Sequence, residues 1–101
     1  MDKYNDELIT KISSFYKTLA DPSRLKIILT LLENEDLCVN CIVDKVDMSQ
    51  TAVSNQLKML KIVGLVSSER RGKNIIYRIN DNHVENIIKL TLIHMEENDE
   101  Y

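Results

Sequence analysis

The sequence predicts a mostly helical α+β domain that carries one β-hairpin. Several segments repeat apolar residues at the three-, four- and seven-residue spacings of amphipathic helices. One segment, residues 75–79, is β-branched and aromatic, as strands are. The chain has 101 residues, the length of a single domain. Its two glycines and one proline leave little room for an all-β fold or a glycine-rich phosphate loop.

The first half of the chain predicts three helices. The first covers about residues 5–20, and Asp21 can cap the second, with Pro22 at a position where the missing N–H costs nothing. The second runs over about residues 23–33, and a short third helix covers about residues 39–46, after a turn. The apolar positions of the first two helices are Leu8, Ile9, Ile12, Phe15, Tyr16 and Leu19, then Leu25, Ile28, Leu29 and Leu32.

The second half predicts a helix, a hairpin and a last helix. Ser49 is a good N-cap for a helix over about 50–63, and Gly64 is suited to end it. Residues 65–69 and 75–79 predict strands joined by a turn that contains Gly72. The last helix covers about residues 83–97. The apolar positions of the fourth helix are Val53, Leu57 and Leu60, with Met59 on a flank. The last helix carries Val84, Ile87, Ile88, Thr91, Leu92 and Met95 at helical spacing.

The element order α-α-α-α-β-β-α is that of a winged helix-turn-helix domain spanning residues 1–101. Residues 50–63 form its expected recognition helix and residues 65–79 its wing. Domains near this size bury only about 60–70% of their unfolded surface. The broad apolar faces of the first and last helices therefore predict a homodimer formed through these two helices.

Several protein classes are excluded by what the sequence lacks. No apolar run approaches the roughly 20 residues that span a bilayer, and the polar segment Met1–Glu7 is unlike a signal peptide. We therefore expect a cytoplasmic protein that contacts no membrane. No nucleophile–base constellation is evident, so we expect neither an enzyme nor a small-molecule substrate.

The charge distribution is uneven along the chain. The formal net charge is −3, but the segment 48–80 carries a local net charge of +5. Its charged residues are Lys58, Lys61, Arg70, Arg71, Lys73 and Arg78, against Glu69 alone. Nucleic-acid binding depends on the local field, so a basic middle between acidic ends is compatible with a DNA partner.

The polar face of the fourth helix is suited to the major groove of double-stranded DNA. Glutamine and asparagine can bond adenine in bidentate fashion, and hydroxyls serve bases or phosphates. The basic hairpin tip would contact the backbone or a minor groove. The alternative is an ordinary solvated helix face, and the basic charge of helix and hairpin together favours DNA. The predicted contacts are Gln50, Thr51, Ser54, Asn55 and Lys58 on the helix, and Arg70, Arg71 and Lys73 on the hairpin.

Three segments and the wing resemble the ArsR/SmtB family of metal-responsive repressors. The segments are TLADPSRLKI at 18–27, DLCV at 36–39 and TAVSNQLKML at 51–60. Gly64-Leu65-Val66, Arg71-Gly72-Lys73 and Tyr77 also match, so the resemblance covers roughly residues 8–97. It implies a homodimeric winged-helix repressor that releases its operator when an inducer binds.

Both histidines lie on the last predicted helix, in two half-sites. Asp81 and His83 stand at its start and His94 and Glu97 near its end. The histidines are about 16 Å apart along a helix, whereas zinc ligands lie about 2 Å from the ion. Antiparallel packing of two copies about a two-fold axis would unite one chain's first half-site with its partner's second. Each dimer would then hold two N₂O₂ sites suited to Zn²⁺, with Co²⁺ as a substitute.

This ligand spacing resembles that of the zinc-sensing branch of the family. Glu97 stands where the nickel branch has a third histidine, which argues against nickel. The competing interpretation is that the four residues are helix caps and solvated surface groups.

Cys38 and Cys41 form a second, thiol-based candidate site. The resemblance places Cys38 at the first cysteine of a family signature for soft metals or arsenite, but Asn40 replaces the second cysteine. Two partly buried structural thiols are the competing expectation.

The leading prediction is a zinc-responsive repressor whose metal-free dimer binds operator DNA and whose inter-subunit zinc sites release it. In one alternative, Cys38 and Cys41 form the sensing site, and the inducer is Cd²⁺, Pb²⁺, arsenite or oxidation. Another is a winged-helix module that binds protein instead of DNA.

Overall fold

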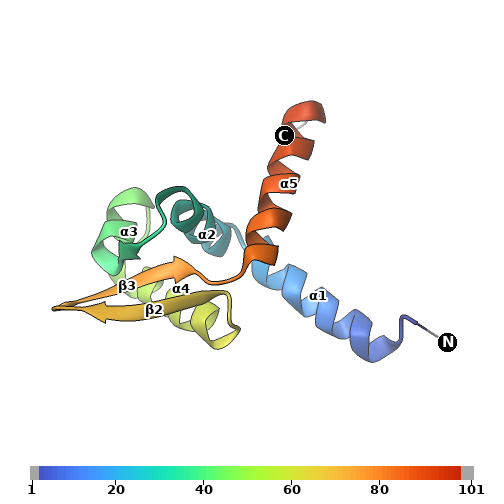
Figure 1. Ribbon diagram of the computed structural model, residues 1–101, viewed down its shortest axis with the longest axis horizontal. Coiled ribbons are helices and arrows are strands. Elements are labelled where there is room, and N and C mark those ends of the chain that lie inside the picture. Colours follow the sequence, from blue (N-terminus) through green and yellow to red (C-terminus); the bar gives the residue numbers. More distant parts are fainter. Residues whose placement is uncertain (1–2, 99–101) are drawn as a thin grey trace.

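The computed structural model describes residues 3–98 and confirms the predicted mostly helical architecture with a hairpin (Figure 1). Within these residues no helix is both long enough and apolar enough to span a bilayer. The elements in order are α1 Asp6–Ala20, α2 Pro22–Asn34, β1 Leu37–Cys38, α3 Val39–Lys45, α4 Gln50–Ile62, β2 Val66–Arg71, β3 Asn74–Ile79 and α5 Asn82–Asn98.

The predicted element order lacked one strand. The two-residue β1 pairs antiparallel with β3, with Leu37 opposite Tyr77 and Cys38 opposite Ile76. The sheet order is β1-β3-β2. A strand of two residues has no detectable periodicity, and only its tertiary partner defines it. The consequence is that the segment before α3 is fastened to the wing.

The hairpin turn is tighter than the expected turn over residues 70–74. Strand β2 continues to Arg71, which pairs with Asn74 at the start of β3. Only Gly72 and Lys73 are left in the turn, and Gly72 has the positive φ of 63° that glycine adopts without steric cost. Arg70 and Arg71 therefore belong to a strand, where successive side chains point to opposite faces.

The helix boundaries arise from the capping residues that the sequence predicts. Asp21 Oδ2 accepts a hydrogen bond from the Arg24 N–H at 3.0 Å, and Ser49 Oγ accepts one from the Ala52 N–H at 3.1 Å. At the end of α4, Gly64 has a φ of 84°. The Gly64 N–H donates to Lys61 O and the Leu65 N–H to Leu60 O, which is a Schellman motif.

The core lies between α2, α3, α4 and the wing. As predicted, Val53, Leu57 and Leu60 of α4 are fully buried. In α2 the expectation was partly wrong, because Ile27 and Leu31 are more buried than Leu25, Leu29 and Leu32, which are only half-buried. The buried apolar residues are Leu19, Ile27, Ile28, Leu31, Ile42, Val46, Val53, Leu57, Leu60, Leu65, Val66, Val84 and Ile88.

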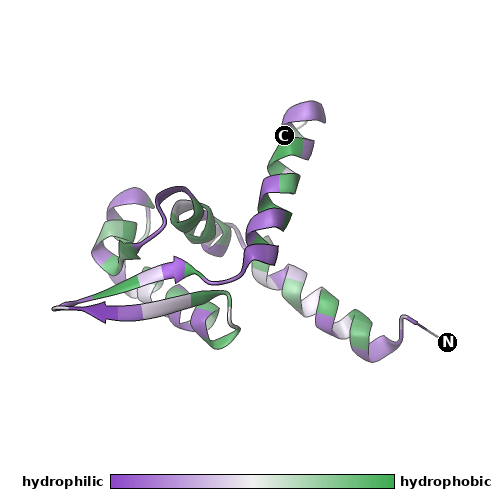
Figure 2. Ribbon diagram, in the orientation of Figure 1, coloured by the Kyte–Doolittle hydropathy of each residue, from purple (hydrophilic) through white to green (hydrophobic). Residues whose placement is uncertain are grey.

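Helices α1 and α5 project from this core on the side opposite the wing tip (Figure 1). Both carry apolar bands along their projecting parts (Figure 2). Leu90 on α5 is 68% exposed and Ile9 on α1 is 53% exposed. The other large apolar residues exposed on the two helices are Leu8, Ile12, Tyr16, Leu92, Ile93 and Met95. These helices thus leave apolar surface uncovered in the single chain.

Candidate nucleic-acid interface and candidate metal ligands

The polar face of α4 is open to solvent, opposite its buried apolar positions. Gln50, Thr51, Asn55 and Lys58 are exposed and Ser54 is half-buried. Because Ser49 caps the helix, its first turn is held in a defined conformation with the polar side chains at its N-terminal end. A helix of this kind can present short polar groups to the edges of bases.

The wing carries two cations that form no ion pair in the part of the chain that the structure describes. Arg70 in β2 and Lys73 in the turn are exposed, and neither forms an ion pair within residues 3–98. The β2–β3 hairpin points away from α1 and α5 (Figure 1). These two side chains are therefore available for phosphate groups.

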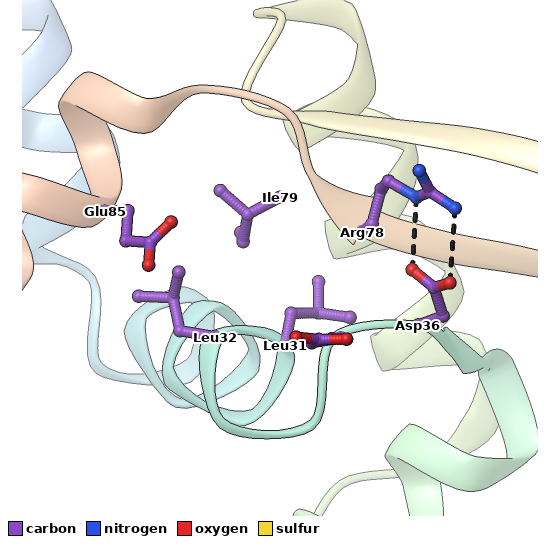
Figure 3. A pocket seen from close by; sticks show the side chains of 7 residues that line it. Leu31, Leu32, Asp36, Arg78, Ile79 and Glu85 are labelled. Carbon is purple, nitrogen blue, oxygen red and sulfur yellow. Dashed lines mark hydrogen bonds and ion pairs between the residues drawn. The ribbon is translucent and has the colours of Figure 1, made fainter.

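Two further wing arginines are held by carboxylates, in what we call the wing network: Asp36, Glu69, Arg71 and Arg78. Asp36 accepts from Arg78 in bidentate fashion, with 3.1 Å to Nε and 3.2 Å to a terminal nitrogen (Figure 3). Arg71 lies 2.6 Å from Glu69 and 3.4 Å from Asp36. The hydrogen bond with Glu69 raises the pKa of Arg71. The sequence placed Arg71 among the DNA contacts; in the free chain it is paired.

The wing network borders a cavity of about 310 Å³ between the end of α2, β3 and the start of α5. Leu31, Leu32 and Ile79 form its apolar wall and Glu85 stands at the α5 side (Figure 3). Glu35, which also lines the cavity, has a φ of 62°. Non-glycine residues rarely adopt that conformation. The turn that presents Asp36 to the wing is therefore conformationally unusual.

Sequence reasoning missed a clamp between α2 and α4. Arg24 Nε donates to Gln56 Oε1 at 3.1 Å, and its terminal nitrogen donates to the Thr18 carbonyl at 3.3 Å. One half-buried guanidinium thus joins the end of α1, the start of α2 and the middle of α4. The spacing of 32 residues between Arg24 and Gln56 gives no signal in the sequence alone.

Asp81 and His83, the first pair of predicted metal ligands, lie next to each other at the start of α5. Asp81 Oδ1 accepts from the backbone N–H of His83 at 2.8 Å and of Val84 at 3.4 Å, and so caps α5. The same oxygen lies 3.3 Å from His83 Nδ1, and the His83 side chain is 94% exposed. A nitrogen and an oxygen donor therefore stand side by side at the start of the helix.

The second half-site is at the far end of α5. His94 and Glu97 are exposed, and His94 Nδ1 lies 3.3 Å from the Asn98 side-chain amide nitrogen. Within one chain the two half-sites stay apart, and among residues 3–98 no three His, Cys, Asp or Glu side chains converge on a common point. The inter-subunit site remains a prediction.

The two cysteines lie together at the start of α3. Cys38 Sγ is 2.6 Å from Cys41 Sγ and accepts from the Cys41 N–H at 3.2 Å, so Cys38 caps the helix. The expectation of two partly buried thiols was half right, because Cys38 is half-buried and Cys41 is exposed. The hydrogen bond from Cys41 lowers the pKa of Cys38 despite some burial, and the same hydrogen bond raises the pKa of Cys41.

Comparison with known proteins decides the family. A family model described as "Bacterial regulatory protein, arsR family" matches residues 21–68. The transcriptional repressor SmtB homolog of Synechocystis sp. is 37% identical over 89 residues, which are 88% of this chain and 67% of that protein. The chain belongs to the arsR family. Its relatives are transcriptional regulators with a winged helix-turn-helix fold, and it is not an enzyme.

Two solved structures share the whole architecture. The antimony-specific transcriptional repressor AntR superposes with a TM-score of 0.86 and 32% identity, covering 98% of this chain and 89% of that chain. A homodimeric winged helix-turn-helix DNA-binding domain from Mycobacterium bovis gives a TM-score of 0.80 and 29% identity, covering 97% and 93%. The agreement extends over α1 and α5, the two helices whose apolar faces are uncovered here.

Proposed function

We propose that this arsR-family chain is a transcriptional repressor that binds operator DNA as a homodimer and releases it when Zn²⁺ binds. The observation that carries the proposal is the separation of surfaces. Polar α4 and the cationic wing occupy one end of the molecule, and the uncovered apolar faces of α1 and α5 occupy the other. A dimer formed through the second surface leaves both copies of the first free for DNA.

The polar end has the components of a groove-reading surface. Gln50, Thr51 and Asn55 offer donors and acceptors to base edges, and Lys58 adds a cation on the same helix. Arg70 and Lys73 supply phosphate contacts beside it. Two-fold symmetry of the protein would match a two-fold operator.

The exposed face of α5 supports antiparallel packing with a second copy. His83, Leu90, His94 and Glu97 follow one another at intervals of seven, four and three residues, so they share a helix face. Leu90, exposed in the single chain, lies close to the midpoint of the four ligand positions. A two-fold axis passing near Leu90 would bury this leucine against its copy and bring the opposite ends of the helices together.

The donor set of the paired ends fits zinc. Asp81 and His83 from one chain with the partner's His94 and Glu97 provide two imidazole nitrogens and two carboxylate oxygens, a set that binds Zn²⁺ or Co²⁺ in tetrahedral geometry. The side-by-side donors of Asp81 and His83, 3.3 Å apart, support this assignment. By linkage, DNA would weaken zinc binding by the factor by which zinc weakens DNA binding, typically about 1–3 kcal/mol.

A zinc titration of the protein–DNA complex tests the proposal. A fluorescent duplex is first selected from a random-sequence library with metal-free protein, and its anisotropy is then followed as zinc is added. Zinc should displace the wild-type protein, and His94→Ala and Glu97→Gln should resist displacement. Glu96→Gln is the matched control, because it removes a neighbouring charge that is outside the ligand set.

Two results would contradict the proposal. If zinc leaves the wild-type complex intact, or if His94→Ala responds as the wild type does, the α5 site is not the sensor. If no duplex is selected and binding is insensitive to salt, the chain is a protein-interaction module instead.

A second candidate keeps the DNA interface and places sensing at Cys38 and Cys41. The 2.6 Å approach of the two sulfur atoms favours it, and the chain's similarity to an antimony-specific repressor makes a thiol-reactive inducer relevant. Replacing both cysteines by serine distinguishes the candidates. Zinc-dependent release survives this change if the α5 site is the sensor and is lost if the thiols are.

A further inference from the structure

We propose that Cys38 and Cys41 form a peroxide-reactive dithiol that closes into an intrachain disulfide and thereby weakens DNA binding. The inference deepens the second candidate above and rests on the DNA-binding function proposed there. It names the inducing chemistry, oxidation by hydrogen peroxide, and the covalent product.

The geometry of the pair is already close to that of the product. The sulfur atoms are 2.6 Å apart, and a disulfide needs about 2.05 Å. Both cysteines are free, and they are joined by the hydrogen bond from the Cys41 N–H to Cys38 Sγ. Little backbone movement is therefore needed to form the bond.

The two thiols have different environments that suit successive steps. Hydrogen bonds from the Cys41 thiol and from the backbone N–H groups of Cys41 and Asn40 lower the pKa of Cys38, so the thiolate forms more readily at Cys38 than at Cys41. The same side-chain hydrogen bond raises the pKa of Cys41, which favours Cys41 as the thiol that keeps its proton for the second step. Cys38 also lines an open cavity of about 200 Å³, through which a small oxidant can reach it.

The chemistry balances with one peroxide. The Cys38 thiolate attacks one peroxide oxygen, the O–O bond breaks, and hydroxide leaves to become water. The resulting sulfenic acid is attacked by the Cys41 sulfur, the S–O bond breaks, and a second water is formed with the Cys41 proton. In sum, two thiols lose two electrons and two protons, and hydrogen peroxide is reduced to two waters.

The pair is linked to the DNA-binding elements by two contacts. Cys38 lies in β1 opposite Ile76 of β3, the return strand of the wing. The cavity that Cys38 lines is also bordered by Gln50, the first residue of α4, and by Lys73 at the wing tip. The disulfide therefore places a covalent link at the junction of the recognition helix and the wing, where it limits how far this junction can adjust to DNA.

A metal site of these thiols within one chain is less well supported. Tetrahedral coordination by protein groups calls for four donors. In the part of the chain that the structure describes, no third His, Cys, Asp or Glu side chain joins the two sulfurs. A dithiol with no further ligand is suited to a two-electron reaction between its own sulfur atoms.

The test measures disulfide formation and DNA binding on the same sample. Reduced, metal-free protein is treated with hydrogen peroxide and then alkylated with iodoacetamide under denaturing conditions. Its intact mass is measured by mass spectrometry. We expect two adducts before treatment and none after it, with a monomeric mass lowered by two hydrogens and restored by dithiothreitol. Affinity for the library-selected duplex should fall about fivefold or more on oxidation and recover on reduction.

Serine variants provide the controls, because serine is also a good N-cap and preserves the start of α3. In Cys41→Ser, oxidation by peroxide should stop at the sulfenic or sulfinic acid of Cys38. In Cys38→Ser, the remaining thiol of Cys41 should react with peroxide no faster than it does in the urea-unfolded protein. The proposal is overturned if wild-type protein retains two alkylatable thiols, forms only disulfides between chains, or keeps its DNA affinity after the bond closes. If reduced protein binds no DNA, the function proposed above fails, while the mass measurement still decides whether the disulfide forms.

Discussion

Replacing Asp36 by asparagine should release a wing arginine for DNA. In the free chain Asp36 binds Arg78 through both carboxylate oxygens and reaches Arg71 at 3.4 Å. A carboxylate in this position competes with a phosphate group for the same guanidinium. Asp36→Asn keeps the shape of the side chain but removes the charge, so Arg78 loses its strongest internal partner while Arg71 keeps Glu69.

The size of the effect follows from the exposure of the network and from the number of charges released. The side chains of Asp36, Arg71 and Arg78 are 35%, 50% and 48% exposed, and ion pairs this open are worth about 0–1 kcal/mol each. The free energy of unfolding should therefore fall by no more than about 1 kcal/mol. One released arginine in each subunit of a dimer adds two phosphate contacts, which steepens the slope of log K against log salt by about 1.8.

The assay is a salt series of anisotropy titrations with a fluorescent random-sequence duplex, because the electrostatic contribution is independent of sequence. Glu33→Gln is the matched control, since it removes one exposed negative charge from α2 outside the wing network. If the slope of Asp36→Asn equals the wild-type slope, Asp36 does not compete with phosphate. If Glu33→Gln gives the same change, the effect comes from net charge and the wing network is irrelevant.

Three further changes test the packing. Leu90→Glu should raise the dissociation constant of the dimer about a hundredfold or more in sedimentation equilibrium. Burying a leucine is worth about 1.5–3 kcal/mol, and each dimer contains two copies of Leu90. An unchanged dissociation constant would show that α5 is not part of the interface. Arg24→Met should lower the free energy of urea unfolding by about 1–2 kcal/mol, since it leaves Gln56 without its charged donor. If Gln56→Leu and the double variant lose the same free energy as Arg24→Met, the effect comes from the Arg24–Gln56 contact. Gly64→Ala should cost about 1–2 kcal/mol through its positive φ alone, because an added Cβ meets no atom within 4 Å. Gly64→Asn should cost less, and equal losses would point to sterics instead of backbone conformation.

Local signals in the sequence were sufficient to place the helices and the hairpin. Asp21, Ser49 and Gly64 each act within four residues of their own position, so their capping roles can be read from neighbouring residues. Periodicity was less informative in α2. Six of the eight residues 25–32 are apolar, so no single face stands out. Only packing against the other helices selects Ile27, Ile28 and Leu31 as the buried residues.

The unpredicted features of the site depend on contacts between distant residues. Strand β1 exists because Leu37 and Cys38 meet β3 some forty positions later. The Arg24–Gln56 clamp likewise joins residues 32 apart. The proximity of the cysteines was predictable from their i, i+3 spacing, but their link to the wing was not, because it runs through β1.

Counting charges along the sequence also misses contacts between distant residues. This omission affects the prediction of DNA binding most. The net charge of segment 48–80, counted from the sequence, is +5. Asp36 lies outside that segment, yet in the fold it binds Arg78 and lies close to Arg71. Within residues 3–98, Arg70 and Lys73 of the wing form no ion pair, and neither does Lys58 on α4. The positive field of the wing in the free chain is therefore weaker than the sequence suggests. Under the proposed DNA-binding function, the turn that holds Asp36 sets how readily Arg78 is released to phosphate, and this turn is followed by β1, which contains Cys38.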